Sequence, residues 1–368
     1  MRTTVAIVGG GLAGLYSARL LHAAGIDFQL FEARNRLGGR ILSADETGRP
    51  SEDGFDLGPS WFWPDMQPAM KALVKELNLA VFAQNSEGDV IFERMSRETP
   101  QRYRGMQQEP QTMRLGGGTG ALVKALANDL PQDRLHLGSR VTHIMLGAGD
   151  VTLTISGAVG GEHSLAAGQM IAALPPRLIE ATIAFTPAIE PSTARHWRET
   201  ATWMAPHAKF FAIYDRPFWR EAGLAGTAQS MVGPLAEIHD ATTASGAAAL
   251  FGFLGVDADQ RVSSGEAALA QACLNQLARL FGAEAHSPRA TIFKDWAVDP
   301  LTATVDDRNA GGHPQPSGRP WVTGAWQNCL SLSGSETSAT EPGYMAGAIG
   351  AAQRAVAETL ARLRTDTK

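Results

Sequence analysis

Two neighbouring stretches near the start of the chain decide the fold: VAIVGGGLAGLYSARLL at residues 5–21 and DFQLFEARNRLGGR at residues 27–40. The apolar run 5–8 predicts a buried strand. Gly9, Gly11 and Gly14 then supply a G-x-G-x-x-G turn into a helix whose N-terminal amides can hold a pyrophosphate. Glu32 ends the next apolar run, at the spacing where an acidic side chain meets an adenosine ribose. The sequence therefore predicts a dinucleotide site in a Rossmann-like α/β domain.

Residues 34–40 separate a flavin site from a nicotinamide site. The segment RNRLGGR places Arg34, Arg36 and Arg40 around Gly38 and Gly39, and DLGPSW follows at residues 56–61. This pattern resembles the FAD-dependent amine oxidase superfamily, which includes monoamine, polyamine and L-amino acid oxidases and related flavin desaturases. A glycine pair lets backbone approach the FAD pyrophosphate, and the following arginine neutralises it. The resemblance also implies an FAD site that includes Gly58, Pro59, Ser60 and Trp61.

The far end of the chain carries a second flavin motif, LSGSETSATEPGYMAGAIGAAQRAVAETLARL at residues 332–363. It resembles the closing segment of the same superfamily, where a strand ends in a glycine (here Gly334), an acid follows, and G-Y-M-x-G-A opens the last helix. The resemblance implies that Glu336 faces the ribityl-pyrophosphate part of FAD. It also implies that Gly343, Tyr344 and Met345 lie along the isoalloxazine. Small residues at the start of a helix allow backbone amides to approach a planar ring.

Two further cofactor and catalytic residues follow from the same resemblance. Val141 stands where the superfamily places backbone contacts to adenine, although an ordinary β-branched strand residue has the same appearance. In HAKFFAIYDRPFW at residues 207–219, period-two alternation puts Lys209 on one face with Phe211 and Ile213. A strand lysine can snorkel to water. The resemblance instead implies that Lys209 contacts flavin N5 through a water and, with Tyr344, is a catalytic residue.

The substrate side departs from the monoamine oxidases. Those enzymes tether FAD through a cysteine shortly after a tryptophan, whereas KDWAVDPLTATVDD at residues 294–307 contains no cysteine. We therefore expect noncovalent FAD. Tyr344 matches one of two aromatic walls facing the flavin, but the partner aromatic is replaced near Val305 or Asp306. Other aromatic residues could compensate or simply pack in the core, namely Trp203, Trp296 and Trp326.

Composition excludes several classes of protein. The 368 residues and 44% apolar content indicate a globular chain of about two domains, and the net charge of −5 indicates neither a nucleic-acid nor a membrane-surface partner. No apolar run reaches the roughly 18 residues of a membrane span. The first strand begins too early to leave room for a signal peptide, so we expect a cytoplasmic protein. Cys273 and Cys329 lie far apart without metal-ligand spacing, and no metal is expected.

The organisation is expected to be interleaved. An FAD-binding domain is assembled from residues 1–65, 113–185 and 297–368, and a smaller α+β substrate domain on a mixed sheet from residues 66–112 and 186–296. Hydrophobic periodicity predicts helices within 66–79 and 115–130, a hairpin with loops within 84–113, and strands at 139–146, 151–157 and 169–176. The short insert between Trp61 and Leu115 indicates a smaller or more open substrate domain than that of the large amine oxidases.

The resemblance implies an FAD-dependent oxidoreductase that oxidises the C–N bond of a small amine or amino acid. Hydride would pass to flavin N5, and oxygen would accept the electrons to give hydrogen peroxide and an imine. Two alternatives stay open. One is a flavin desaturase or dehydrogenase that acts on a C–C bond and uses another acceptor. The other is a flavin-bound protein without amine oxidase activity, as the incomplete pair of aromatic walls permits.

Overall fold

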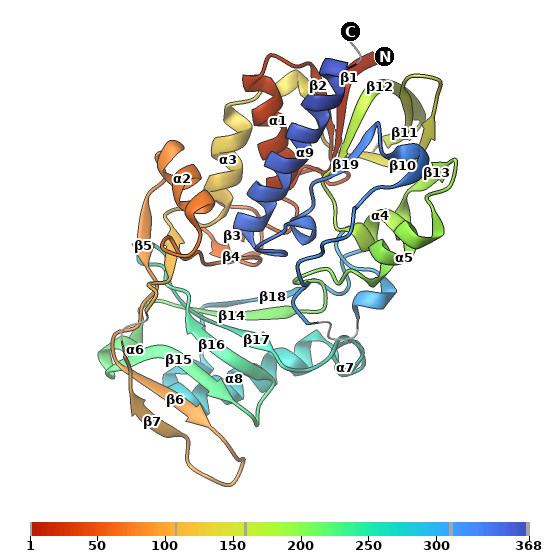
Figure 1. Ribbon diagram of the computed structural model, residues 1–368. Coiled ribbons are helices and arrows are strands. Elements are labelled where there is room, and N and C mark those ends of the chain that lie inside the picture. Colours follow the sequence, from red (N-terminus) through yellow and green to blue (C-terminus); the bar gives the residue numbers. More distant parts are fainter. Residues whose placement is uncertain (1, 107–108, 158–159, 309–311, 366–368) are drawn as a thin grey trace.

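The computed structural model describes residues 2–106, 109–157, 160–308 and 312–365. It contains two large sheets, one above the other in Figure 1. Helices pack on both faces of the first sheet and on the outer face of the second. The first sheet has the order β13-β10-β11-β12-β1-β2-β9, and β19 pairs with β12. Its strands are β1 (Arg2–Val8), β2 (Phe28–Phe31), β9 (Leu135–His136), β10 (Ser139–Leu146), β11 (Val151–Gly157), β12 (Glu162–Ala172), β13 (Ala184–Thr186) and β19 (Leu330–Leu332).

The centre of the first sheet is parallel. β1 pairs in parallel with β2 and with β12, and β12 pairs in parallel with β19. The helix α1 (Leu12–Ala23) connects β1 to β2, which is the βαβ unit that the glycine turn predicts. Because parallel strands present their carboxyl ends at one edge, the ends of β1, β2, β12 and β19 form the edge at which a ligand is expected.

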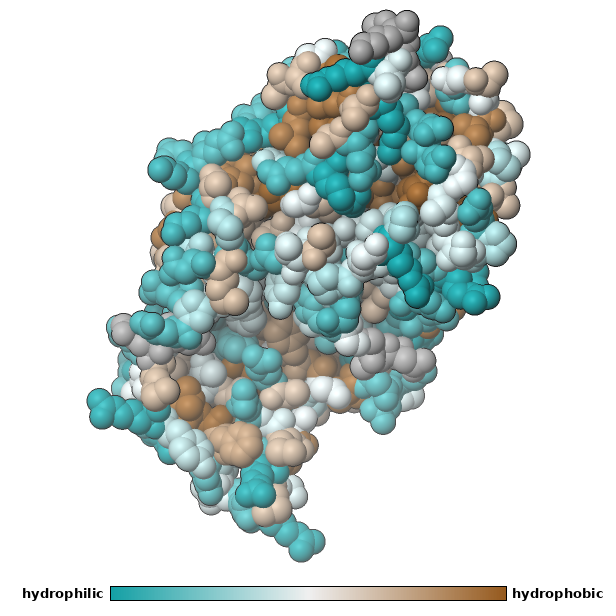
Figure 2. Space-filling model, in the orientation of Figure 1, coloured by the Kyte–Doolittle hydropathy of each residue, from teal (hydrophilic) through white to brown (hydrophobic). Residues whose placement is uncertain are grey.

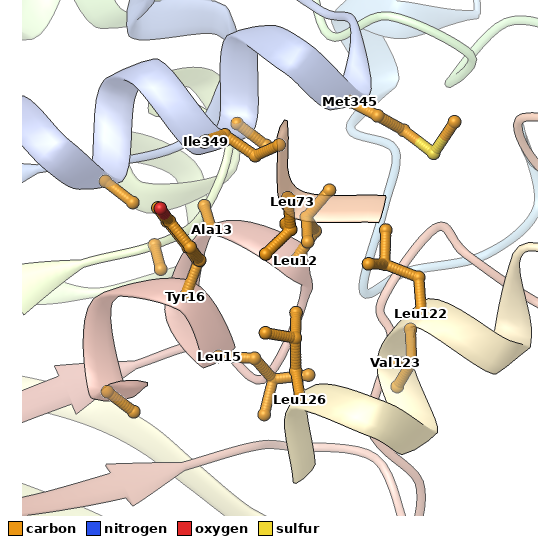
Figure 3. Close-up of a cluster of buried hydrophobic side chains, with 14 of the residues drawn as sticks. Leu12, Ala13, Leu15, Tyr16, Leu73, Leu122, Val123, Leu126, Met345 and Ile349 are labelled. Carbon is orange, nitrogen blue, oxygen red and sulfur yellow. The ribbon is translucent and has the colours of Figure 1, made fainter. Parts of the chain in front are cut away.

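Four helices share one hydrophobic core on this sheet. They are α1, α2 (Pro68–Glu76), α3 (Gly120–Asn128) and α9 (Met345–Thr365). Figure 3 shows their side chains converging, with Leu12 and Leu15 of α1 facing Leu73, Leu126 and Ile349. Each of these five side chains is at most 5% exposed. The core therefore joins four stretches of sequence that lie far apart.

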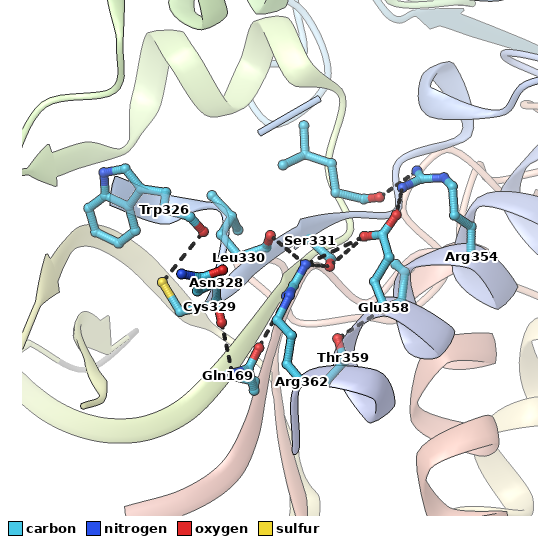
Figure 4. Close-up of polar contacts among 12 residues, drawn as sticks. Gln169, Trp326, Asn328, Cys329, Leu330, Ser331, Arg354, Glu358, Thr359 and Arg362 are labelled. Atoms are coloured by element: carbon cyan, nitrogen blue, oxygen red, sulfur yellow. Dashed lines mark hydrogen bonds and ion pairs between the residues drawn. The ribbon is translucent and has the colours of Figure 1, made fainter. Parts of the chain in front are cut away.

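Polar contacts fix α9 on the edge of the sheet (Figure 4). Arg362 donates to Oε1 of Gln169 at 3.1 Å and to Oγ of Ser331 at 2.9 Å, and it pairs with Glu358. Arg354 donates to the carbonyl of Leu332 at 2.8 Å. These bonds satisfy groups at the end of β19, so α9 starts in a fixed position beside the carboxyl edge of the sheet.

The second sheet has the order β18-β14-β17-β16-β15-β6-β7 and is antiparallel except where β15 meets β6. Its strands are β6 (Asp89–Glu93), β7 (Gln101–Arg104), β14 (Ala208–Tyr214), β15 (Leu224–Ser230), β16 (Leu235–Asp240), β17 (Ala248–Leu254) and β18 (Ala290–Asp295). The outer face packs on α8 (Glu266–Phe281). The inner face faces the first domain through Phe211, Ile213 and Phe251, which pack on Phe55 and Leu57.

The remaining elements are short and connect or cap the two sheets. Two small antiparallel pairs join β3 to β4 and β5 to β8. Short single-turn helices also occur. The bounds are β3 (Ser43–Ala44), β4 (Phe55–Asp56), β5 (Val81–Ala83), β8 (Met113–Leu115), α4 (Pro176–Thr182), α5 (Pro191–Glu199), α6 (Phe218–Glu221), α7 (Ala258–Ser264), η1 (Gln132–Arg134), η2 (Ala283–His286), η3 (Val305–Asp307), η4 (Gly324–Trp326) and η5 (Ser335–Thr337).

The mixed α/β fold class expected from the sequence is confirmed, and the predicted helices and strands form where expected apart from their bounds. One strand is much longer than predicted, because β12 begins at Glu162 to pair with β11. Residues 89–104 and 208–295 form the second sheet, as an interleaved organisation requires. The helix α2 packs with α1 and α9, although the expected boundaries assign it to the substrate domain. The division at those boundaries stays a prediction.

The face of the molecule drawn in Figure 2 is largely hydrophilic, with apolar areas interrupted by polar side chains. Among the residues that the structure describes, no helix is long and apolar enough to cross a membrane.

Candidate functional site

The two glycine loops of the sequence motif lie against each other at the end of β1. Gly9 has φ +106°, and a Cβ on Gly14 would stand 1.9 Å from the Gly9 carbonyl oxygen, so neither position accepts a side chain in this turn. The amide of Gly38 donates to the carbonyl of Gly10 at 2.8 Å. A Cβ on Gly11 would meet nothing closer than the Gly38 carbonyl at 3.8 Å. Gly11 therefore leaves open space in front of the helix, as a bound phosphate needs.

Glu32 supports this loop and carries the acidic charge expected beside it. Its carboxylate accepts hydrogen bonds from the amides of Gly10 at 2.7 Å and Arg34 at 2.8 Å. The residue is only 4% exposed and still borders the cavity described below. Two backbone donors fix the orientation of the carboxylate, which is the arrangement that a ribose-binding acid requires.

The three arginines of RNRLGGR have different roles. Arg34 leaves the loop to pair with Asp299 at 2.7 Å and to donate to Oγ1 of Thr302, so it ties residues near 300 to the cavity. Arg36 donates to carbonyls within its own loop, including Gly39 at 2.8 Å, and is not among the residues that line the cavity. Arg36 therefore shapes the glycine loop, and a direct contact between its side chain and the cofactor stays a prediction.

Arg40 joins the two ends of the sequence. It contacts both carboxylate oxygens of Glu336, at 2.5 and 3.1 Å, and also donates to the carbonyl of Trp203 at 2.8 Å. The Glu336 side chain is fully buried, whereas that of Arg40 is 20% exposed and lines the cavity. A buried carboxylate needs a paired cation. The sequence placed both residues at the cofactor but not in contact with each other.

The turn at residues 56–61 is held from the second sheet by several side chains. The ammonium of Lys209 donates to the carbonyls of Asp56 at 3.1 Å and Gly58 at 2.6 Å and to Oγ of Ser60 at 3.0 Å. The Nε1 of Trp296 donates to the carbonyl of Leu57 at 2.9 Å. These bonds cross between the two domains, so the position of the turn depends on β14 and β18.

The location of Lys209 bears on its expected catalytic role. It is 1% exposed, is not among the residues that line the cavity, and lies over the rings of Phe251 and Phe253 at 4.5 and 5.0 Å. An ammonium has three donors, and all three are used by the 56–60 turn. Burial lowers the pKa of Lys209 to about 7, against the opposing effect of the nearby Asp56 carboxylate. A water-mediated contact with the flavin would need one of these bonds to open.

Aromatic rings gather at one part of the site. The ring of Tyr344 stacks on His313 at 4.4 Å, and His313 lies 4.1 Å from Trp203, which in turn meets His207 edge-on at 5.1 Å. Nε2 of both histidines is buried without a hydrogen-bond partner, and burial lowers the pKa of both. The imidazoles are therefore neutral at pH 7. Val305 is 79% exposed, and the rings that meet Tyr344 are those of His313 and, edge-on at 6.3 Å, Trp63.

One cavity connects these parts. It encloses about 1400 Å³ including space open to solvent. Its walls combine both glycine loops, the acid, the arginines and the aromatic end. The predicted residues on its wall are Gly9, Gly11, Glu32, Arg34, Gly38, Gly39, Arg40, Pro59, Trp61, Val141, Gly334, Gly343, Tyr344 and Met345. A long ligand with a pyrophosphate and two ring ends fits this combination.

Other predicted residues lie behind the wall. Gly14 packs against Gly9, Gly58 and Ser60 accept the hydrogen bonds of Lys209, and Arg36 and Glu336 bond to the loop and to Arg40. Of the three compensating tryptophans, only Trp203 lines the cavity, because Trp296 and Trp326 are buried in the interior. Sequence reasoning missed several wall residues, which reach the cavity from loops without a local motif: Gln67, Ser139, Arg140, Leu178 and Pro300.

Two family models match the chain. The model of the flavin containing amine oxidoreductases matches residues 85–360, and the model of an NAD(P)-binding Rossmann-like domain matches residues 7–77. The chain belongs to the flavin containing amine oxidoreductase family. It is therefore a flavin-dependent oxidoreductase. Among the described residues there is no group of three or more His, Cys, Asp or Glu that could hold a metal ion.

The relatives of this flavin oxidoreductase include a Mycobacterium tuberculosis protein with a provisional name as a flavin-containing monoamine oxidase. It is 26% identical over 466 aligned positions, which cover 98% of this chain and 97% of the relative. An L-amino acid dehydrogenase of Synechocystis is 32% identical over 193 residues, or 51% of this chain and 39% of the relative. A solved putrescine oxidase matches with a TM-score of 0.81 at 21% identity, covering 98% and 99% of the two chains. The likeness to that structure shows the fold.

The chain is shorter than its Mycobacterium relative. The alignment with the Mycobacterium relative spans 466 positions, whereas this chain has 368 residues. Roughly one hundred positions of that alignment thus have no residue here, so the relative has segments that this flavin oxidoreductase lacks. The resemblance to that relative still runs across nearly the whole of both chains.

We expect Arg40→Met to destabilise the protein as well as weaken FAD binding. The substitution leaves the buried Glu336 carboxylate unpaired, which costs about 3–5 kcal/mol in other proteins. The double variant Arg40→Met with Glu336→Gln should recover much of the melting temperature, because the unpaired charge is gone, but not the FAD affinity. Thermal melts and FAD titrations check both. Equal melting temperatures for the single and double variants would contradict the pairing.

The pKa of Lys209 predicts a pH dependence of stability. The folded protein releases the Lys209 proton near pH 7, whereas an unfolded lysine keeps it to about pH 10.4. Unfolding therefore takes up a proton between these values, so stability should rise with pH across this window. Melting temperatures at pH 6.5–9.5, compared with those of Lys209→Met, isolate this group. A difference between the two proteins that stays constant over this range would mean that Lys209 keeps an ordinary pKa.

Proposed function

We propose that this chain is an amine oxidase that binds FAD without a covalent bond and oxidises a small amine. The observation that carries the proposal is the single cavity in which Glu32 and the two glycine loops meet Arg40 and Tyr344. These residues come from opposite ends of the sequence. Glu32 would bind the ribose, the backbone of the glycine loops is accessible to the pyrophosphate, Arg40 supplies a positive charge, and Tyr344 supplies an aromatic wall. Membership of the amine oxidoreductase family supports the same reaction class.

Noncovalent binding is supported by the position of the two cysteines, Cys273 and Cys329, which are the only ones in the chain. Cys273 lies in the core beneath the second sheet, and Cys329 lies in the core of the first. Neither lines the cavity. Burial raises the pKa of Cys273 to about 12 and that of Cys329 to about 11, so the nucleophilic thiolate is disfavoured at both positions.

When bound, FAD supplies the electron acceptor for the carbon–hydrogen bond beside the amine nitrogen, which leaves an imine, and we propose oxygen as the final acceptor with hydrogen peroxide as product. The protein's own residues provide binding and orientation. Trp61, Trp203 and Tyr344 form apolar wall at the aromatic end and limit the access of water there. Lys209 fixes the backbone on which Trp61 stands, and its proposed water-mediated contact with the flavin remains part of this proposal.

A dehydrogenase that passes electrons to an acceptor other than oxygen is the second candidate. One observation favours it, namely the 32% identity with a protein named L-amino acid dehydrogenase over half of this chain. The two candidates share the flavin site and the reduction of the flavin by substrate. They differ in whether air-saturated buffer reoxidises the reduced protein rapidly with formation of peroxide.

The mode of flavin binding can be tested by precipitating the purified yellow protein with acid. All the flavin should stay in the supernatant and be identified as FAD, because both thiols are buried away from the cavity. Flavin that remains with the washed pellet would show a covalent bond and contradict the proposal.

The reaction can be tested by mixing the FAD-bound protein anaerobically with a panel of amines and amino acids. At least one amine should bleach the oxidised flavin band, and readmitted oxygen should restore it with one peroxide per turnover. Lys209→Met in the same assay separates two roles of the lysine. Weaker FAD binding indicates support of the 56–60 turn, whereas normal FAD content with about tenfold slower reduction or reoxidation indicates a contact at the flavin. Failure of every amine to bleach the band would refute amine oxidation.

A further inference from the structure

The strand pairing of the second sheet places a carboxylate on the same sheet face as Lys209. Phe253 of β17 pairs with Lys209 of β14 on one side and with Glu237 of β16 on the other. Directly paired residues project from the same face of a sheet. Lys209 reaches the 56–60 turn of the flavin domain from this face, so Glu237 also projects from the face that looks toward the flavin domain.

Glu237 is linked to the wall of the flavin cavity through one neighbour. Its Oε1 lies 2.7 Å from Nε2 of His239, and the His239 ring meets the Trp61 ring edge-on at 4.7 Å. Trp61 lines the cavity and also contacts Phe253, with 6.5 Å between ring centroids. The side chain of His239 is 10% exposed, whereas that of Glu237 is 49% exposed. The carboxylate therefore stands at the solvent-side margin of an aromatic surface that continues into the site.

Glu237 is also unusual among the acids of its sheet. The other described acidic residues on these strands are each paired with an arginine: Asp89 with Arg102, Glu93 with Arg279, Asp240 with Arg220 and Asp295 with Arg261. Within the part of the chain that the structure describes, the ion-pair partner of Glu237 is His239. The hydrogen bond from His239 lowers the pKa of Glu237, so the carboxylate is charged at neutral pH.

We propose that Glu237 is a specificity-determining residue that binds a second cationic group of the substrate, so that the preferred substrates are diamines or polyamines. This inference rests on the proposed amine oxidation. One amino group would lie at the aromatic end of the cavity, and the carbon chain would cross the surface of Trp61 and Phe253. The distal ammonium would then pair with Glu237. Aromatic faces and a carboxylate both attract ammonium groups.

The other charges near this path favour a cationic substrate. Lys209 faces the same side of the sheet, but its three donors are bound to the 56–60 turn. Arg40 is paired with the buried Glu336. A substrate carboxylate would have to displace an existing bond to reach either of these two cations, whereas the side chain of Glu237 is 49% exposed and accessible to a distal ammonium.

The test compares α,ω-diamines of three to eight carbons with monoamines of the same length. In Glu237→Gln, KM for the best diamine should rise by about tenfold or more, since a charge-assisted hydrogen bond is lost, while kcat stays within twofold. KM for the matched monoamine should not change. Glu237→Asp, which retains the charge, should restore part of the preference. Glu341→Gln is the matched control, because Glu341 lies beside the cavity-lining Gln67 from another direction.

A binding measurement separates this inference from the proposed function. Calorimetric titration of the dithionite-reduced, FAD-bound protein with the same amines needs no turnover. Tighter binding of a diamine than of its monoamine, abolished by Glu237→Gln, supports the subsite even if no amine reduces the flavin. Equal binding of diamine and monoamine by the parent protein would overturn it. So would a preference for diamines that survives in Glu237→Gln or disappears in Glu341→Gln.

Discussion

The contact between Lys209 and the 56–60 turn is the interaction on which the arrangement of the two domains depends. A buried ammonium costs a large desolvation energy unless each of its donors is satisfied. Here two carbonyls and a hydroxyl satisfy all three donors, and aromatic rings of the second sheet surround the side chain. The turn therefore cannot move away from β14 without exposing an unpaired charge. Trp61 follows the turn directly, so this contact also fixes the position of Trp61.

A second constraint brings the ends of the sequence together. Glu336 is completely buried, and Arg40 supplies the positive charge that makes this burial tolerable. The pair holds the loop after β19 against the glycine loop after β2, while α9 is fixed by its bonds to Ser331 and Gln169. Cofactor binding and folding thus depend on the same two residues. An Arg40 variant can lose flavin because the folded protein is less stable, so its FAD affinity and its melting temperature both have to be measured.

The aromatic end of the cavity is built by residues from separate segments of the chain. Val305 lies largely in solvent, whereas His313 stacks on Tyr344 next to Trp203. In the second sheet, Phe253 pairs with Glu237 on the face that also carries Lys209. In the proposed function, the choice of substrate depends on this face of the second sheet, and the oxidation takes place at the flavin.

The sequence by itself determined the parts whose physics is local. Gly9 and Gly14 are required because the turn between β1 and α1 leaves no space for a Cβ, and Glu32 follows at the spacing set by one βαβ unit. Period-two alternation also placed Lys209 on one face with Phe211 and Ile213. Only the tertiary structure decided which donors meet which acceptors across long separations. The Arg40–Glu336 pair, the enclosure of Lys209 behind the 56–60 turn and the stacking of His313 on Tyr344 all join segments that lie far apart in the sequence. No local pattern encodes them, because strand register and loop packing fix these distances only when the two sheets come together.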